Sequence, residues 1–117
     1  MQPRIELYDF GYIVIDGEEY DRDLIIVPSR GVVENWWRVE GHRVSIEDVR
    51  DYLLEDADIV IFGTGYSGMV SVDRDVVELF RSRGLDVLVM DSRSAVDRYN
   101  EEVSKGKKVL LFIHLTC

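Results

Sequence analysis

The chain has 117 residues, enough for one ordinary hydrophobic core, and 46% hydrophobic with 32% charged residues is a balance typical of globular proteins. A formal net charge of -9 argues against nucleic-acid binding, which needs a stripe of basic residues, and disfavours an acidic partner or an anionic membrane. The only cysteine, Cys117, excludes an intrachain disulfide, and no apolar stretch approaches the roughly 20 residues of a membrane-spanning helix.

The first residues of the chain include acidic side chains and lack the apolar centre of a signal peptide. Together with the single cysteine, this predicts a cytoplasmic protein. Abundant Glu, Asp and Arg with few Asn, Gln and Cys are also typical of proteins from thermophiles. No linker or repeat divides the sequence, so we expect a single domain over residues 1–117.

The first part of the chain predicts short strands. Residues 12–15 and 18–20 flank Asp16-Gly17, a typical two-residue hairpin turn. Strands are also expected at residues 24–27 and from Gly31 to about Val39. Alternate side chains of a strand face opposite sides, so Trp37 is expected in the core and Trp36 on the exposed side. There Trp36 could form a binding surface or, equally, pack under a loop or a helix of the same chain. The acidic residues around Tyr20 are expected to be solvated: Glu18, Glu19, Asp21 and Asp23.

From Ser45 onward, helices and strands are predicted to alternate. Ser45 and Asp48 have the spacing of a helix-capping pair, and further helices are expected at about residues 73–83 and 92–104. Strands are expected at 59–62, 85–90 and 109–115, and the nearly continuous apolar character of the last is typical of a central strand covered on both faces. The fold class is therefore α/β, with helices on both sides of a largely parallel sheet and a small N-terminal β annex.

The segment Gly63-Thr-Gly-Tyr-Ser-Gly68 follows a predicted strand and spells G-x-G-x-x-G, the pattern that cradles the pyrophosphate of a dinucleotide. Asp91, after the next strand, has the position of the acid that binds the ribose. However, Met69 to Val72 separate the motif from the next helix, which in a dinucleotide site begins inside the motif. Asp91 can instead cap the helix that starts at Ser92.

We therefore interpret the glycine loop as a tight turn that needs the backbone freedom of glycine. The binding of a smaller anion or a mononucleotide at its N–H groups stays open as an alternative. No pattern predicts catalysis: Ser67 lacks the G-x-S-x-G context of a nucleophile, and His42 and His114 lack that of a triad. His114 and Cys117 would point to opposite faces of a strand, so no metal site is predicted. No cofactor is predicted either.

The order and spacing of several residues resemble the Mth-domain family of small uncharacterised proteins. Its named members include mitochondrial NADH dehydrogenase complex I assembly factor 3 and the adipogenesis-associated Mth domain-containing protein. The resemblance covers most of the chain and rests on Phe10-Gly11, Gly17-x-x-Tyr20-x-x-Asp23, Trp37 with His42, Gly63-Thr64-Gly65, Asp91, Ala95, Asn100 and Gly106.

The resemblance implies a three-layer α/β domain whose central sheet, of about five strands, is mixed but mostly parallel. It implies that the last strand runs antiparallel to the others, which would place His114 at the edge opposite the glycine loop. It also implies that the G-T-G element is a structural turn, and that the protein acts through protein partners as an assembly or regulatory factor.

We therefore expect a non-enzymatic binding or assembly-type protein, a monomer or homodimer, with unidentified protein partners. The alternative is a protein or enzyme that binds a nucleotide or phosphorylated metabolite at the Gly63–Gly68 loop. Asn100 could equally anchor the last helix through hydrogen bonds to backbone groups. The candidate site residues are Gly63, Thr64, Gly65 and Tyr66 in the loop, Asp91 and Asn100 as nearby polar groups, and Trp36 as a surface residue.

Overall fold

The N-terminal segment folds into a small antiparallel sheet of three strands, β1 (Ile5–Asp9), β2 (Tyr12–Ile15) and β3 (Glu18–Tyr20). The computed structural model describes all residues from Met1 to Cys117. Between β2 and β3, Asp16 and Gly17 have φ values of 47° and 81°, as the predicted two-residue turn requires. This sheet is the predicted N-terminal annex. The predicted hairpin accounts for β2 and β3, and β1 is a third strand that was not predicted.

The central sheet contains five strands in the order β5-β4-β10-β7-β9. The strands are β4 (Leu24–Val27), β5 (Gly31–Val33), β7 (Ile59–Thr64), β9 (Asp86–Met90) and β10 (Val109–His114). β7 is parallel to both β9 and β10, whereas β4 is antiparallel to both β5 and β10. The sheet is therefore mixed, and the prediction that it is mostly parallel is wrong.

The connections explain these strand directions. A short turn joins β4 to β5, and only antiparallel neighbours can be joined so tightly. Helices α2 (Arg74–Ser82) and α3 (Ser92–Ser104) cross over between β7, β9 and β10, which makes these three strands parallel. The last strand, β10, is consequently not reversed relative to β7. The reversed strand is β4, which runs antiparallel to both of its neighbours, β5 and β10.

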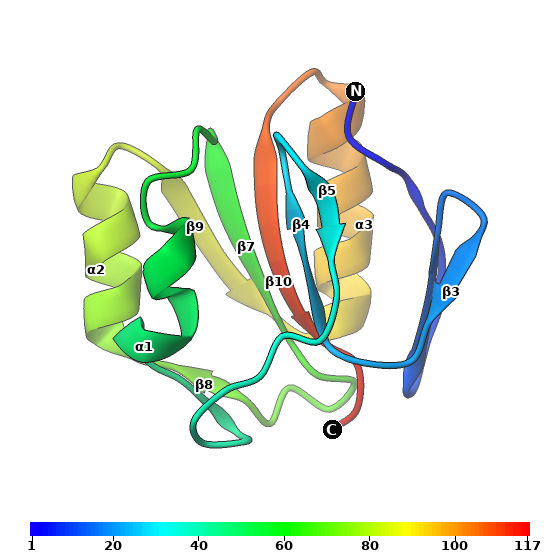
Figure 1. The fold of residues 1–117 in the computed structure, drawn as a ribbon, viewed down its shortest axis with the longest axis horizontal. Coiled ribbons are helices and arrows are strands. Elements are labelled where there is room, and N and C mark those ends of the chain that lie inside the picture. Colours follow the sequence, from blue (N-terminus) through cyan, green and yellow to red (C-terminus); the bar gives the residue numbers. More distant parts are fainter.

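Helices cover both faces of the central sheet, so the fold has three layers (Figure 1). On one face, α2 lies with the short helix α1 (Ile46–Val49) and a single 3-10 turn (Arg50–Tyr52). On the other face, α3 lies beside the N-terminal sheet. A pair of two-residue parallel strands, β6 (Arg43–Val44) and β8 (Ser71–Val72), connects the segments that lead into α1 and α2. No helix has both the length and the apolar character to cross a membrane.

The central strand β10 contributes side chains to both cores. All six of its residues are buried, as the continuous apolar run predicts. Leu110 and Phe112 pack with α1 and α2, while Leu111 and Ile113 pack with α3 and β1–β2. Each such side chain contributes about 1.5–3 kcal/mol when fully buried. This burial fixes the position of the end of β10, where the candidate site lies.

Candidate functional site

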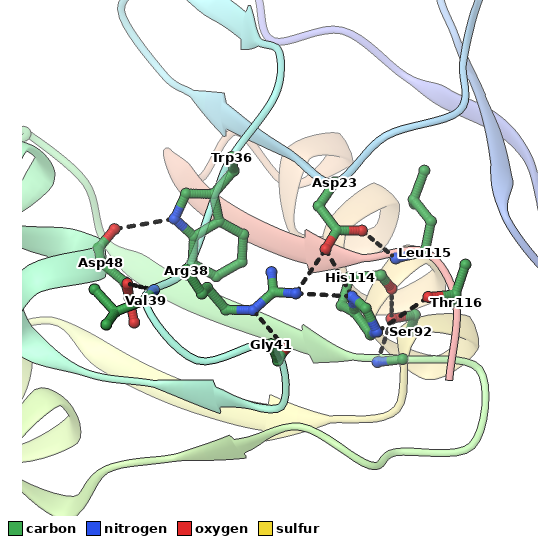
Figure 2. Close-up of polar contacts among 11 residues, drawn as sticks. Asp23, Trp36, Arg38, Val39, Gly41, Asp48, Ser92, His114, Leu115 and Thr116 are labelled. Carbon is green, nitrogen blue, oxygen red and sulfur yellow. Dashed lines mark hydrogen bonds and ion pairs between the residues drawn. The ribbon is translucent and has the colours of Figure 1, made fainter.

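Three polar residues from distant parts of the chain meet where β10 ends (Figure 2). His114 is the last residue of β10 and pairs with Thr64 of β7, so it lies at the same edge as the glycine loop. The expectation of the opposite edge is wrong because β10 is parallel to β7. Asp23 precedes β4, which starts at this edge because it runs antiparallel to β10. Arg38, from the segment after β5, completes what we call the Asp23 cluster: Asp23, Arg38 and His114.

The carboxylate of Asp23 holds the cluster together. Its Oδ2 lies 2.9 Å from Nη2 of Arg38 and 2.6 Å from Nδ1 of His114. Its Oδ1 accepts a 2.8 Å hydrogen bond from the backbone N–H of Leu115. A carboxylate only accepts hydrogen bonds, so Nδ1 of His114 carries the proton. The other ring nitrogen, Nε2, lies 3.3 Å from the hydroxyl oxygen of Thr116.

The cluster is largely shielded from water. The exposed fractions of the side chains are 6% for Arg38, 9% for His114 and 16% for Asp23, so the expectation that Asp23 is solvated is wrong. Burial by itself raises the pKa of Asp23. The hydrogen bonds from His114 and Leu115, with the charge of Arg38, outweigh burial and hold the pKa below its ordinary value of 3.8. Asp23 is therefore ionised and pairs with the Arg38 cation.

The loop that carries Arg38 reverses the predicted orientations of the two tryptophans. Asn35 has a φ of 59°, which ends the strand alternation after β5 and changes which side chain turns inward. Trp36 is consequently buried against Phe112, with ring centroids 5.1 Å apart. Trp37 is 73% exposed. The predictions of a core Trp37 and a surface Trp36 are both wrong.

Asp48, at the third position of α1, fixes this loop on both sides of Arg38. Its backbone oxygen accepts a 2.9 Å hydrogen bond from the indole N–H of Trp36, and its Oδ1 accepts one of 2.9 Å from the N–H of Val39. Its Oδ2 accepts the N–H of Ser45 at 2.7 Å, as the predicted capping pair requires. One buried aspartate thus holds both the start of α1 and the position of Arg38.

A cleft of about 350 Å³ lies beside the Asp23 cluster. Arg38 donates through Nε to the oxygen of Gly41 at 2.9 Å, and its guanidinium carbon lies 4.9 Å from the centre of the Trp36 ring. The remaining nitrogen, Nη1, is buried and has no hydrogen-bond partner. The cleft is lined by Asp21, Arg22, Asp23, Asn35, Trp36, Trp37, Arg38, Gly41, His114 and Thr116.

Close packing explains why two positions of the glycine loop, Gly63 and Gly65, have no side chain. Gly65 has a φ of 110°, and a side chain there would place its Cβ 2.4 Å from the backbone oxygen of Cys117. A Cβ on Gly63 would come within 3.2 Å of Ser92 and Ala95 in α3. The hydroxyl of Ser92 accepts the Gly65 N–H at 2.8 Å and donates to the oxygen of His114 at 2.6 Å. Close packing of the loop against α3 and β10 therefore accounts for the G-T-G sequence.

Most backbone N–H groups at the glycine loop are already engaged. Five of them donate to acceptors within the chain, at 2.7 to 3.1 Å, and so do not converge on a ligand: those of Gly65, Tyr66, Gly68, Met69 and Val70. The strand β8 separates the loop from α2, which begins only at Arg74. The helix N-terminus is thus displaced from the loop, unlike that of a dinucleotide site.

The other predicted site residues have separate positions. The hydroxyl of Thr64 donates to the oxygen of Met90 at 3.0 Å. Tyr66 lies under the guanidinium of Arg93, at 4.4 Å, and beside the exposed ring of Phe10, at 5.9 Å. Thr64 and Tyr66 are therefore at the sheet edge that carries the Asp23 cluster, but neither lines the cleft.

Asp91 and Asn100 have structural partners on α3. Asp91 caps the helix by accepting the N–H of Ser94 at 3.0 Å, and this hydrogen bond is the main cause of a lowered Asp91 pKa. Asn100 pairs with both backbone groups of Ile5, accepting its N–H at 3.0 Å and donating to its oxygen at 2.7 Å. Asn100 thus attaches β1 to α3 and lies apart from the cleft.

No motif in the sequence marks the cleft residues as a site, although part of the signal is present. Asp23, Trp37 and His42 belong to the spacing pattern on which the family resemblance rests. The His42 ring stands edge-on to that of His114, with centroids 6.1 Å apart. No sequence pattern indicated a role for Arg38, because a single arginine in a loop is unremarkable until its partners are known.

The chain thus folds into a small three-layer α/β domain with a mixed five-stranded sheet, and the Asp23 cluster lies at one edge of that sheet. The chain belongs to a protein family of unknown function, DUF498/DUF598, which matches it over residues 5–114. It is similar to the conserved hypothetical protein PH1505 from Pyrococcus horikoshii OT3, with 31% identity, a TM-score of 0.82 and coverage of 97% of this chain and 99% of that one.

Two further solved structures have the same fold. MT938 is 27% identical, with a TM-score of 0.81 and coverage of 98% of this chain and 99% of that one. A Mth938-like domain from Bordetella pertussis is 18% identical, with a TM-score of 0.63 and coverage of 97% of this chain and 85% of that one. This last similarity concerns the fold alone. The matches support the predicted Mth-domain family, while the likeness to its two named members stays a prediction.

Proposed function

We propose that this chain is a non-enzymatic, assembly-type binding protein that docks a protein partner at the sheet edge where β10 ends. The observation that carries the proposal is Trp37, which is 73% exposed at the rim of a cleft whose floor contains the buried Arg38. Val39, two residues further on, is 79% exposed. Tryptophan and arginine are the residues most enriched where binding energy concentrates at protein interfaces.

The rigidity of the loop supports a docking role. Asp48 holds Trp36 and Val39, the residues on either side of Trp37 and Arg38, so the path of the loop is set before any partner arrives. A surface that is already ordered loses less conformational entropy on binding. Two further exposed apolar residues, Phe10 and Met69, are carried by segments at the same edge of the sheet, and both add apolar area for a partner.

An enzymatic role has less support. The side chains of Thr116, His114 and Asp23 form a contact chain of a hydroxyl, a base and an acid, as in a nucleophilic enzyme. However, the hydroxyl oxygen of Thr116 lies 3.3 Å from Nε2 of His114, which exceeds the usual 2.6–3.2 Å. Asp23 also serves Arg38 and Leu115, as a structural carboxylate does. The alternative of a nucleotide or phosphorylated metabolite at the Gly63–Gly68 loop is disfavoured by the engaged N–H groups. Cytoplasmic location stays a prediction.

A photo-crosslinking experiment tests the docking proposal. The photoreactive amino acid p-benzoylphenylalanine would replace Trp37 in one variant and Leu54, which is 78% exposed and does not line the cleft, in a control. After irradiation in the cell of origin, we expect a defined adduct with another protein from position 37 only. Equal adducts from both positions, or none, would contradict the proposal. An adduct between two copies would identify the partner as a second copy of this chain.

A further inference from the structure

Arg38 Nη1 is the one buried side-chain nitrogen or oxygen of the chain that has no hydrogen-bond partner. The Arg38 side chain is 94% buried, with an exposed fraction of 6%. An unpaired buried donor carries a desolvation penalty, so native structures retain few such groups and each calls for an explanation. Because Arg38 lines the cleft, the simplest explanation is an acceptor that arrives with a ligand.

The charge of Arg38 limits what that acceptor can be. Asp23 lies 2.9 Å from Nη2 and already neutralises the guanidinium, and Nε is bonded to the Gly41 oxygen. A second carboxylate or a phosphate would bring a further negative charge beside Asp23 and Asp21, in a chain whose net charge is -9. The other cation of the lining, Arg22, is 64% exposed and lies 4.0 Å from Asp21, so it offsets that charge only weakly. Like charges in a shielded site repel strongly. The free donor therefore suits a neutral oxygen, such as the carbonyl of an amide.

The shape of the cleft agrees with an amide. Its volume of about 350 Å³ is at the small end of ligand sites and accommodates a peptide unit with its flanking atoms. The Trp37 indole at the rim offers a flat apolar surface over which a planar amide can lie. In Figure 2, one nitrogen of the Arg38 guanidinium, Nη1, has no dashed line to any residue drawn.

We propose that this cleft binds a main-chain amide of an extended segment of the protein partner, with Arg38 Nη1 donating to the carbonyl oxygen and Trp37 covering the amide plane. The inference rests on the proposed docking function and names the group that is recognised. Nη1 is almost inaccessible in the unbound chain, so the lining shifts when the ligand enters. Trp37 is the lining side chain best able to move, since 73% of it is exposed.

A titration of the full chain, labelled with ¹⁵N at its arginines and tryptophans, tests this inference by NMR. The probe is N-acetylglycine N-methylamide, compared with sodium acetate and inorganic phosphate. We expect the amide alone to give saturable shifts of the Arg38 guanidinium and the Trp37 indole. Arg38→Lys keeps the positive charge near Asp23 but removes Nη1, and should weaken binding at least tenfold. The control Arg93→Lys changes an exposed arginine beside Tyr66 and should bind as the wild type does.

Several results would overturn the inference. These are no shift with the amide, equal affinity in Arg38→Lys and the wild type, or larger shifts with acetate or phosphate. If Arg38→Lys does not fold, Trp37→Ala replaces it, and unchanged amide affinity in that variant counts against the inference. A crosslinked partner at position 37 without amide binding would leave the docking function standing and remove only this inference. Absence of both would remove both.

Discussion

The glycine loop and the Asp23 cluster lie at the same edge of the sheet and have opposite characters. The loop spells a known ligand-binding motif, yet the chain itself satisfies most of its N–H groups and packs closely against Gly63 and Gly65. The cluster matches no motif, yet it contains a buried donor without a partner and an exposed tryptophan beside it. A motif gives the residue types that a ligand would need, but only the hydrogen bonds of the folded chain show which groups are still available.

This comparison predicts different consequences when each region is changed. Substitutions in the loop should lower stability, because its groups serve the chain's own structure. Substitutions at the rim of the cleft should affect binding with little effect on stability.

Replacing Asp23 with Asn should produce the largest loss of stability, about 3–5 kcal/mol, because Arg38 would stay buried without its countercharge. Urea denaturation measures the change. The matched control is Asp73→Asn, which removes a carboxylate paired with Arg43, whose side chain is 50% exposed. That pair should contribute far less, because water screens the attraction between exposed charges. Equal losses in the two variants would mean that the cluster is no more than a surface ion pair.

The same carboxylate should make stability depend on pH in acid. The pKa of Asp23 is lower in the folded chain than its ordinary 3.8, so its contribution to stability is complete above 3.8 and decreases as the pH falls below that value. In Asp23→Asn this contribution is absent at every pH. Urea denaturation of both proteins across this range should show their stabilities converging in acid. A constant difference would contradict the lowered pKa.

Replacing Gly65 with Ala should cost about 2–4 kcal/mol, from an unfavourable φ together with the clash against Cys117. Gly84→Ala is the control, since Gly84 has a similar φ of 88° but nothing within 4 Å of the added Cβ. The control should lose only about 1 kcal/mol. Thermal and urea denaturation of the two variants would compare them, and similar losses would show that the chain near Cys117 moves aside.

Removing the side chain of Asn100 should cost about 1–3 kcal/mol, because the N–H and oxygen of Ile5 would lose their partners. In this variant, the backbone amide hydrogen of Ile5 should exchange with solvent faster than those of β7. This result would assign Asn100 to the attachment of β1. Unchanged stability combined with a loss of crosslinking at position 37 would instead return Asn100 to the binding residues.

The smallest effect on stability is expected for Trp37→Ala, within about 0.5 kcal/mol, because the indole is mostly in solvent. Its neighbour is the control: Trp36→Ala removes a buried ring packed on Phe112 and should cost about 3–5 kcal/mol. Thermal denaturation of the pair measures the contrast. A large loss in Trp37→Ala would show that the exposed indole supports the fold rather than a partner.

Much of the secondary structure could be predicted because its signals are local. The Asp16-Gly17 turn, the strands β2, β3 and β4, and the full extent of α3 all match the expectations from turn, cap and periodicity. The central position of β10 also followed from its unbroken apolar run. The candidate site was harder to predict: of the residues proposed for it, Trp36 alone lines the cleft, and it does so from the buried side.

The sequence by itself determined the hairpin, the capped helices and, through their order along the chain, the α/β class, because each of these elements depends on neighbours within a few residues. The tertiary structure decided the rest. Strand direction depended on which connections are helical. A single positive φ at Asn35 set which tryptophan is buried. Asp23, Arg38 and His114 came together only through strand pairing, since Asp23 and His114 are separated by 91 positions and no local pattern can specify a contact at that distance.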